Sequence, residues 1–100
     1  MCAVYPDARN PFAFVGMPCA DLADWAVDEV WLPMGPDAVD FVDITSQLER
    51  KLRALRCHAS QHRDPDAMET RMRTWWQKIA EANGLPESSS AESFRVIDTR

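Results

Sequence analysis

Several features that commonly build functional sites are scarce or missing in this 100-residue sequence. It has only three glycines, Gly16, Gly35 and Gly84, which excludes a glycine-rich phosphate-binding loop, and no GxSxG motif marks a serine nucleophile. No apolar run approaches the roughly 20 residues that span a bilayer, and the N-terminus lacks the charged and apolar regions of a signal peptide. We therefore expect a cytoplasmic protein without a membrane partner.

Cysteine is also scarce, and its spacing suggests no pairing. Cys2, Cys19 and Cys57 form no CxxC motif, and their odd number leaves at least one thiol unpaired, which suits a reducing compartment. We interpret each as a small buried apolar side chain rather than as a redox or nucleophilic group.

An excess of positive charge is missing as well. The formal net charge is −5, and between residues 49 and 73 basic residues are interleaved with acidic ones. Nucleic acid is therefore not expected as a partner. Hydrophobic residues make up 46% of the chain, which at this length indicates a single globular domain over residues 1–100 with a modest core.

The chain begins with a proline-rich segment. Pro6, Pro11 and Pro18 predict an extended connector with turns over residues 1–18, because proline interrupts regular helix. The opening MCAVY has apolar character but no cap, so it looks like the last turn of a helix whose beginning is missing.

Three short segments are rich in strand-forming residues. A buried strand is predicted within residues 26–34, where Val30, Trp31 and Leu32 follow one another ahead of a Pro-Met-Gly-Pro turn. Residues 41–44 and 93–98 predict two more strands.

The first predicted helix begins near Ser46. Thr45 or Ser46 can be the N-cap, and Ser46 with Glu49 matches a capping box. Glu49 and Arg53 are spaced for an i,i+4 ion pair. One apolar stripe on this helix comprises Leu48, Leu52, Leu55 and Ala59.

The second predicted helix repeats this design. Asp66 and Glu69 form an acidic variant of the capping pattern, and Asn83 with Gly84 predicts the end. The apolar stripe comprises Met68, Met72, Trp75 and Ile79. Trp75 is thus expected in the core, whereas Trp76 either widens the buried face or contacts a partner.

Two groups of polar residues suggest metal sites but match no complete motif. His58 and His62 have the i,i+4 spacing of a helical metal pair, yet no HExxH glutamate lies between them, so we interpret them as structural or surface histidines. Asp37, Asp40 and Asp43 lack the EF-hand pattern, and Asp43 is expected to favour the start of the following helix.

Five segments in a fixed order carry a family resemblance. They are YPDARNPFAF (5–14), VDEVWL (27–32), VDIT (42–45), KLRALRCHASQ (51–61) and AESFRVID (91–98). The clearest stretch lies within residues 42–62, where a short strand, a helix cap and an amphipathic helix lead to an HxSQ ending. Together the segments resemble the PIG-L/LmbE-like zinc-dependent N-deacetylases. Their order and spacing extend the resemblance over nearly the whole chain.

The resemblance implies an α/β fold, the C-terminal part of a Rossmann-like (LmbE-like) sandwich with short strands plus two amphipathic helices. In that family, two histidines and an aspartate bind zinc, and a second aspartate acts as general base toward the metal-bound water. The water attacks the N-acetyl carbonyl of a glucosamine-type substrate and releases acetate and an amine.

The zinc and base motifs of the family, PHPDDE-like and HPDH-like segments, have no counterpart in residues 1–100. No catalytic or metal-binding residue is therefore assigned, and no zinc is expected in this chain alone. The chain is expected to be the C-terminal part of such an N-deacetylase, without the N-terminal metal-binding half, and inactive as an isolated piece.

Arg9, His58 and Gln61 are the candidate substrate-binding residues that the resemblance suggests. Arg9 could instead hold a loop in place, and His58 with Gln61 could form a hydrogen-bond network that fixes the connector after the helix. The partner of the complete enzyme would be an N-acetylated, amino-sugar-type small molecule, with a homo-oligomer possible. The alternative function is that of a stand-alone, non-catalytic α/β module that binds a protein partner or self-associates.

Overall fold

The computed structural model describes residues 4–13, 16 and 22–100. The chain divides into two compact units, Met1–Val30 with Ile97–Arg100 and the larger Trp31–Val96. Cys2 and Cys19 lie outside the described residues. The expected mixture of helices and strands is confirmed, and the two longest helices lie in the larger unit.

The smaller unit begins with a short helix, α1 (Val4–Ala8). The prediction that the prolines exclude helix here was wrong, because Pro6 falls in the first turn, where backbone N–H groups have no partner within the helix. The chain then turns, with the N–H of Asn10 donating to the carbonyl of Asp7 at 3.1 Å. The N–H of Trp25 donates to the carbonyl of Ala8 at 2.8 Å.

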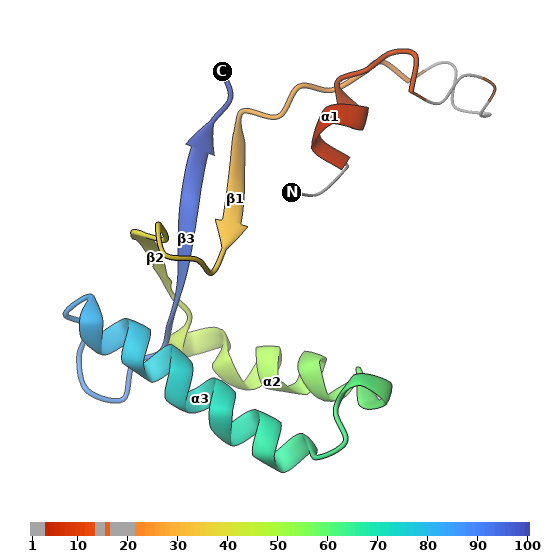
Figure 1. Cartoon of the computed structure of the whole chain (residues 1–100). Helices are drawn as coiled ribbons and strands as arrows, with labels where there is room; N and C mark the ends of the chain where they lie inside the picture. The colour runs from red at the N-terminus through yellow and green to blue at the C-terminus, as the bar shows by residue number, and fades with distance from the viewer. Residues whose placement is uncertain (1–3, 14–15, 17–21) are drawn as a thin grey trace. The chain divides into compact units, whose positions relative to one another are not determined.

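Three antiparallel strands form one sheet in the order β1-β3-β2 (Figure 1). They are β1 (Glu29–Pro33), β2 (Asp40–Asp43) and β3 (Ala91–Asp98). In the β2–β3 register, Asp40 lies opposite Phe94 and Asp43 opposite Ala91. All three predicted strands are thus confirmed, and β3 starts two residues earlier than expected.

The prediction that β1 is a buried strand was wrong. Its residues alternate between exposed and half-buried positions, and Trp31 remains 46% exposed. The ring of Trp31 meets that of Phe94 edge to face, with centroids 5.4 Å apart. Trp31 therefore packs along the sheet surface rather than in a core.

The first main helix begins with a 3-10 turn, η1 (Thr45–Gln47), and continues as α2 (Leu48–Arg56). The predicted capping box is not formed, because Ser46 lies inside the 3-10 turn and caps neither helix. Asp43 provides the expected support instead. Its Oδ1 accepts hydrogen bonds from the N–H and the hydroxyl of Thr45, which lower the pKa of the Asp43 carboxyl.

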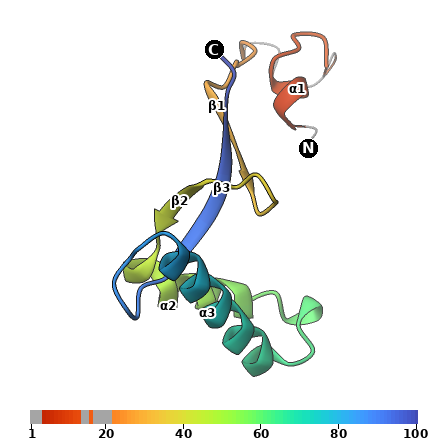
Figure 2. The same ribbon diagram turned by 60° about the vertical axis from the view of Figure 1, so that its left-hand side comes forward.

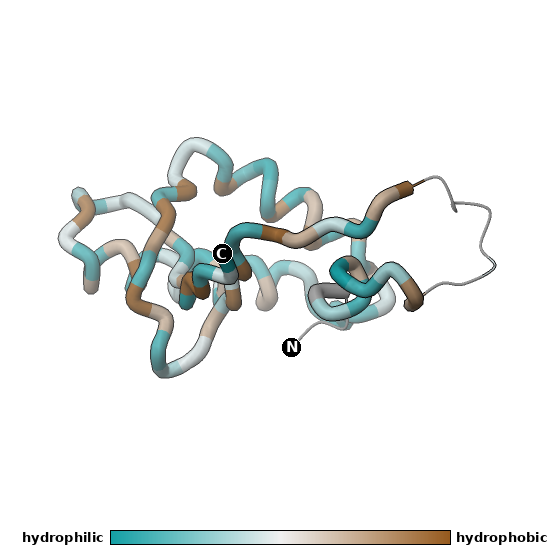
Figure 3. Tube along the Cα trace, turned by 90° about the horizontal axis from the view of Figure 1, so that it is seen from above, coloured by the Kyte–Doolittle hydropathy of each residue, from teal (hydrophilic) through white to brown (hydrophobic). Residues whose placement is uncertain are grey.

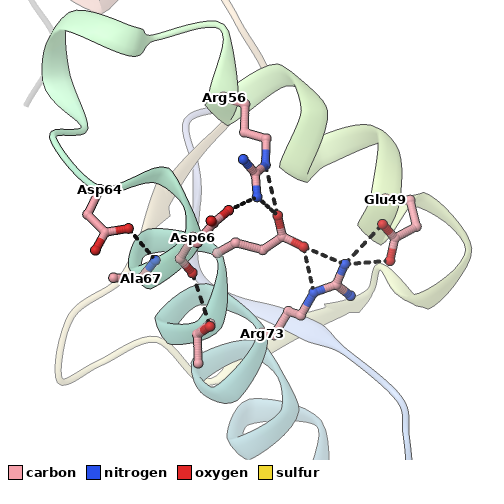
Figure 4. Close-up of polar contacts among 8 residues, drawn as sticks. Glu49, Arg56, Asp64, Asp66, Ala67 and Arg73 are labelled. Atoms are coloured by element: carbon pink, nitrogen blue, oxygen red, sulfur yellow. Dashed lines mark hydrogen bonds and ion pairs between the residues drawn. The ribbon is translucent and has the colours of Figure 1, made fainter.

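A second 3-10 turn, η2 (Ala59–Gln61), leads to α3 (Pro65–Ala82). The N-cap of α3 is Asp64, not the predicted Asp66, and its Oδ1 accepts from the N–H of Ala67 at 2.9 Å (Figure 4). Pro65 occupies the first helical position, which requires no N–H donor. The predicted end of this helix at Asn83 and Gly84 is confirmed.

The helices α2 and α3 lie side by side, next to the point where β2 leads into α2 (Figures 1 and 2). Along the trace, hydrophobic and hydrophilic residues alternate in short bands, as expected for elements with one buried side (Figure 3). The core of the larger unit consists of Ile44, Leu52 and Trp76, with the partly buried Leu48, Leu55, Met72 and Ile79 packed against it.

The prediction that Trp75 lies in the core was wrong, and of the two alternatives for Trp76 the structure supports burial. Trp76 is buried, with 6% of its surface exposed, whereas Trp75 is 47% exposed. The buried side of α3 follows the i,i+4 series Met68, Met72, Trp76 and Ala80 rather than the predicted stripe. Trp75, about 100° away around the helix, therefore lies at the edge of the packed side.

Candidate functional site

The connection between α2 and α3 contains two of the three candidate substrate-binding residues. Its path is fixed by backbone hydrogen bonds, with the N–H of His58 donating to the carbonyl of Leu55 at 3.1 Å and that of Gln61 to the carbonyl of His58 at 2.9 Å. Both side chains are exposed, and neither makes a hydrogen bond within the described part of the chain. They are therefore accessible to a ligand.

The possible histidine pair does not lie on one helix. Because α2 ends at Arg56, His58 precedes η2, and His62 follows it in extended conformation. Among the described residues, no three His, Cys, Asp or Glu side chains gather closely enough to hold a metal ion. Cys57, interpreted as buried, is exposed, and its thiol lies 3.4 Å from the carbonyl oxygen of Arg53.

An open pocket of about 460 Å³ with a mixed polar and apolar lining lies beside this connection. Its lining residues are Gln61, His62, Arg63, Asp64, Ala67 and Arg71. The charged groups of the lining are the Asp64 carboxylate, whose Oδ1 caps α3, and the guanidinium groups of Arg63 and Arg71. The arrangement suits hydrogen bonding to a polar or hydroxyl-rich molecule.

Sequence reasoning missed Arg63, Asp64 and Arg71 as parts of this site. The Asp64–Pro65 pair was an available signal, since an acidic N-cap followed by proline marks a helix start. If α3 begins at Pro65, Ala67 and Arg71 lie four residues apart within the helix and therefore on the same side of it. Only the folded connection shows that this side faces Gln61 and His62.

A network of ion pairs holds the ends of α2 and α3 beside the connection (Figure 4). Arg56, in the last turn of α2, contacts Asp66 at 2.7 Å and Glu69 at 2.6 Å. Arg73 contacts Glu69 at 2.8 Å and Glu49 at 2.7 Å. The predicted Glu49–Arg53 pair was therefore wrong, because the carboxylate of Glu49 reaches across to α3.

These contacts shift the ionisation of the network. Hydrogen bonds from Arg73 and Arg56 lower the pKa of Glu69, and hydrogen bonds to the carboxylates raise the pKa of Arg56 and Arg73. A cation at the end of α2 and an anion at the start of α3 also suit the two helix dipoles. The network thus favours one fixed geometry of the polar connection.

Arg9, the third candidate, belongs to the smaller unit, whereas His58 and Gln61 belong to the larger one. Its side chain is exposed and follows α1 directly. The structure thus brings together His58 and Gln61 but describes Arg9 within a separate unit.

A second hollow lies between α3 and the sheet and is mainly apolar. It has a volume of about 170 Å³. Its lining residues are Pro33, Met34, Met72, Trp75, Trp76, Ile79, Glu92 and Ser93. At its polar side, Lys51 contacts Glu92 at 2.5 Å and lies 5.2 Å from the ring centroid of Trp76. This hollow offers an apolar contact surface rather than reactive groups.

The structure therefore defines an α/β domain with a three-stranded antiparallel sheet, a packed helix pair and a polar connection between the helices. No protein-family model, curated protein or solved structure matches this chain. No helix in the described ranges combines the length and apolar character needed to cross a membrane.

Proposed function

We propose that this chain is the C-terminal part of a zinc-dependent N-deacetylase of the PIG-L/LmbE type, which removes the N-acetyl group from a GlcNAc-type or related amide in the cytoplasm. The ordered set of five resembling segments carries the proposal. Four of them fall on framework elements of the structure, namely β1, the exit of β2, the α2–η2 stretch and β3. These elements build the sheet and the polar connection between α2 and α3. The resembling segments therefore include the elements that position the candidate site.

The sheet surface supports a role as part of a larger fold. β1 and β2 are the edges of the described sheet, and Trp31, Phe41 and Val42 are 46%, 42% and 38% exposed. Exposed edges with apolar residues are suited to accept further strands or a covering layer. In the proposal, these three strands join the remainder of a Rossmann-like sandwich.

Because residues 1–100 have no counterpart of the family's zinc motifs, the metal in this proposal is held by residues outside this chain. A bound zinc ion would supply an activated water and polarise the amide carbonyl. His58 and Gln61 contribute hydrogen bonds to the substrate, because their side chains are exposed at a fixed turn. Arg9 is the third proposed substrate contact.

The test compares two lengths of chain. We expect the DNA upstream of the Met1 codon to encode an HPDH-like segment in frame, and the extended protein to release acetate from N-acetylglucosaminides until zinc is chelated. The 100-residue chain alone is expected to release none. An unrelated upstream sequence, with no acetate release from the extended protein, would contradict the proposal.

Variants of the extended protein test the substrate contacts. His58→Ala should raise KM about 2- to 10-fold, the loss typical of one hydrogen bond, while Ser60→Ala in the same exposed turn should leave KM unchanged. Equal effects of the two substitutions on KM would remove His58 from the proposed site.

The alternative is a non-catalytic module that binds a partner or a second copy, and the apolar hollow beside the exposed Trp75 and Met34 favours it. This alternative predicts a cooperatively folded 100-residue chain that forms a defined complex and binds no zinc. Size-exclusion chromatography distinguishes it from the deacetylase proposal, which predicts poor solubility of the isolated piece. Neither hypothesis predicts zinc in the 100-residue chain, so bound zinc would contradict both.

A further inference from the structure

At the edge of its packed side, α3 carries a tryptophan, Trp75, that the fold leaves about half exposed. We define the Trp75 face by the residues of α3 that line a shallow, open depression of about 600 Å³, namely Thr70, Arg71, Thr74, Trp75, Lys78, Ile79 and Ala82. Trp75 is 47% exposed, while its neighbour Trp76 is buried. Exposed tryptophan is enriched where proteins bind one another.

The threonines make this face less polar than the sequence suggests. The hydroxyl of Thr70 donates to the carbonyl of Asp66, and that of Thr74 to the carbonyl of Thr70, both at 3.0 Å. Because these hydroxyls bond to the helix backbone, the threonines offer chiefly methyl groups to a partner. Together with Trp75, Ile79 and Ala82 they form an apolar strip.

Two cations border Trp75 along the helix. Arg71 and Lys78 lie four residues before and three residues after it, and so share its side of α3. Neither forms an ion pair with any described residue, whereas Arg56, Arg73 and Lys51 all do. The Trp75 face is therefore apolar at its centre and positively charged at both ends.

This charge is opposite to that of the chain as a whole. Residues 45–85 contain eight basic and five acidic side chains, although the complete chain has a net charge of −5. The positive charge is concentrated on the helical part, and on the Trp75 face no internal carboxylate pairs with it among the described residues. A partner that complements this face must be acidic and carry an apolar side chain.

We propose that the Trp75 face binds an acidic amphipathic helix of another protein. An apolar side chain of that helix packs on Trp75, and carboxylates on either side pair with Arg71 and Lys78. The proposal goes beyond the deacetylase function and does not depend on it.

Charge also disfavours other partners for the Trp75 face, namely a second copy of the chain, a membrane and a nucleic acid. A symmetric pair of Trp75 faces would place Arg71 of one copy near Lys78 of the other, where like charges repel. An anionic membrane or a nucleic acid would meet a chain of net charge −5 and only two cations on this face, far fewer than tight phosphate binding uses.

The experiment uses the full chain and two labelled helical peptides with identical leucine positions, one flanked by glutamates and the other by lysines. Fluorescence anisotropy should show that the glutamate peptide binds about tenfold or more tightly than the lysine peptide, with affinity falling as salt is added. Failure of the glutamate peptide to bind, or equal binding of the two peptides, overturns the proposal.

Matched variants locate the contact. Arg71→Glu with Lys78→Glu should weaken binding of the glutamate peptide about tenfold or more and improve binding of the lysine peptide. Arg50→Glu with Arg53→Glu is the control of equal charge change, because both are exposed cations of α2 that form no ion pair among the described residues. Equal weakening by this control would show that the peptide responds to net charge alone, and would overturn the proposal.

Two further measurements test whether a membrane or a second copy of the chain binds the Trp75 face instead. Phosphatidylserine vesicles should bind the chain no better than phosphatidylcholine vesicles, and Trp75→Ala should leave its elution volume unchanged in size-exclusion chromatography. Preferential binding to the anionic vesicles, or a dimer that Trp75→Ala dissociates, would replace the proposed partner by a membrane or a second copy. Circular dichroism of each variant checks that the fold is retained.

Discussion

At the scale of single residues, position around a helix matters more than residue type. Trp75 and Trp76 are chemically identical neighbours, yet only Trp76 belongs to the core with Ile44 and Leu52. The free energy of folding that each contributes should differ accordingly, because burial removes nearly all of the surface of Trp76 from water but only about half of that of Trp75.

Replacement of the two tryptophans tests this difference. Trp76→Ala is expected to lower the free energy of unfolding by about 3–5 kcal/mol, the usual cost of emptying a buried aromatic site. Trp75→Ala should cost about 1 kcal/mol or less, as for exposed positions. Urea unfolding followed by circular dichroism measures both, and equal losses would contradict the described packing.

Asp43 gives a prediction that depends on pH. Its carboxylate accepts two hydrogen bonds from Thr45, so its pKa lies below the ordinary value of 3.8. A lowered pKa in the folded state stabilises the fold above pH 3.8, and this stabilisation is lost as the pH falls through the folded-state pKa. The sequence interpretation of Asp43 as a residue that supports the helix start agrees with these contacts.

Asp43→Asn should therefore unfold at lower urea concentration than the parent chain at pH 7, and the difference should shrink as the pH falls below 3.8. Glu87→Gln is the control, since Glu87 is an exposed loop residue without a hydrogen bond among the described side chains. A difference that is independent of pH would show that the Asp43 charge has no part in the effect.

At the scale of elements, the ion-pair network joins α2 to α3 across the polar connection. Arg56 contacts two carboxylates of α3, whereas Arg53, one turn earlier, contacts none within the described chain. The network is exposed and screened by water, so its stabilising effect should be small and should depend on salt.

Arg56→Ala should lower the melting temperature more than Arg53→Ala at low ionic strength, and the gap between the two variants should narrow in concentrated salt. Thermal melts followed by circular dichroism, in dilute and in concentrated sodium chloride, measure this gap. A gap that salt leaves unchanged would indicate that Arg56 acts through packing of its aliphatic chain instead.

At the scale of the whole molecule, the two units differ in how much they bury. All buried core residues lie in Trp31–Val96, and no described residue of the smaller unit is buried. Amide hydrogen exchange should therefore be slowest in α2, α3 and the central strand β3, and faster in the smaller unit. Mass spectrometry of exchanged peptides measures this, and equal protection of both units would contradict the division.

The sequence alone was sufficient for the three strands and the two long helices, because these elements depend on neighbouring residues. The strand at residues 93–98, the stripe of Leu48, Leu52 and Leu55, and the stop at Asn83 and Gly84 follow from spacing and composition. The helix caps and the buried side of α3 do not. His58 and Gln61 were named from the resemblance that the HxSQ ending carries, and their role in substrate binding stays a prediction. The pocket residues Arg63 and Arg71 were not named from sequence, because the turn of the chain brings them beside Gln61.

What the sequence by itself determined about this protein is thus its charge and the existence of its three strands and two long helices, while its deacetylase family stays a prediction. Only the tertiary structure decided that β3 lies between β1 and β2, that Glu49 pairs with Arg73, and that Trp75 remains exposed. The physical reason is that pairing and burial depend on partners distant in sequence. Local spacing determines on which side of its helix or strand each side chain lies. It does not determine which other element packs against that side.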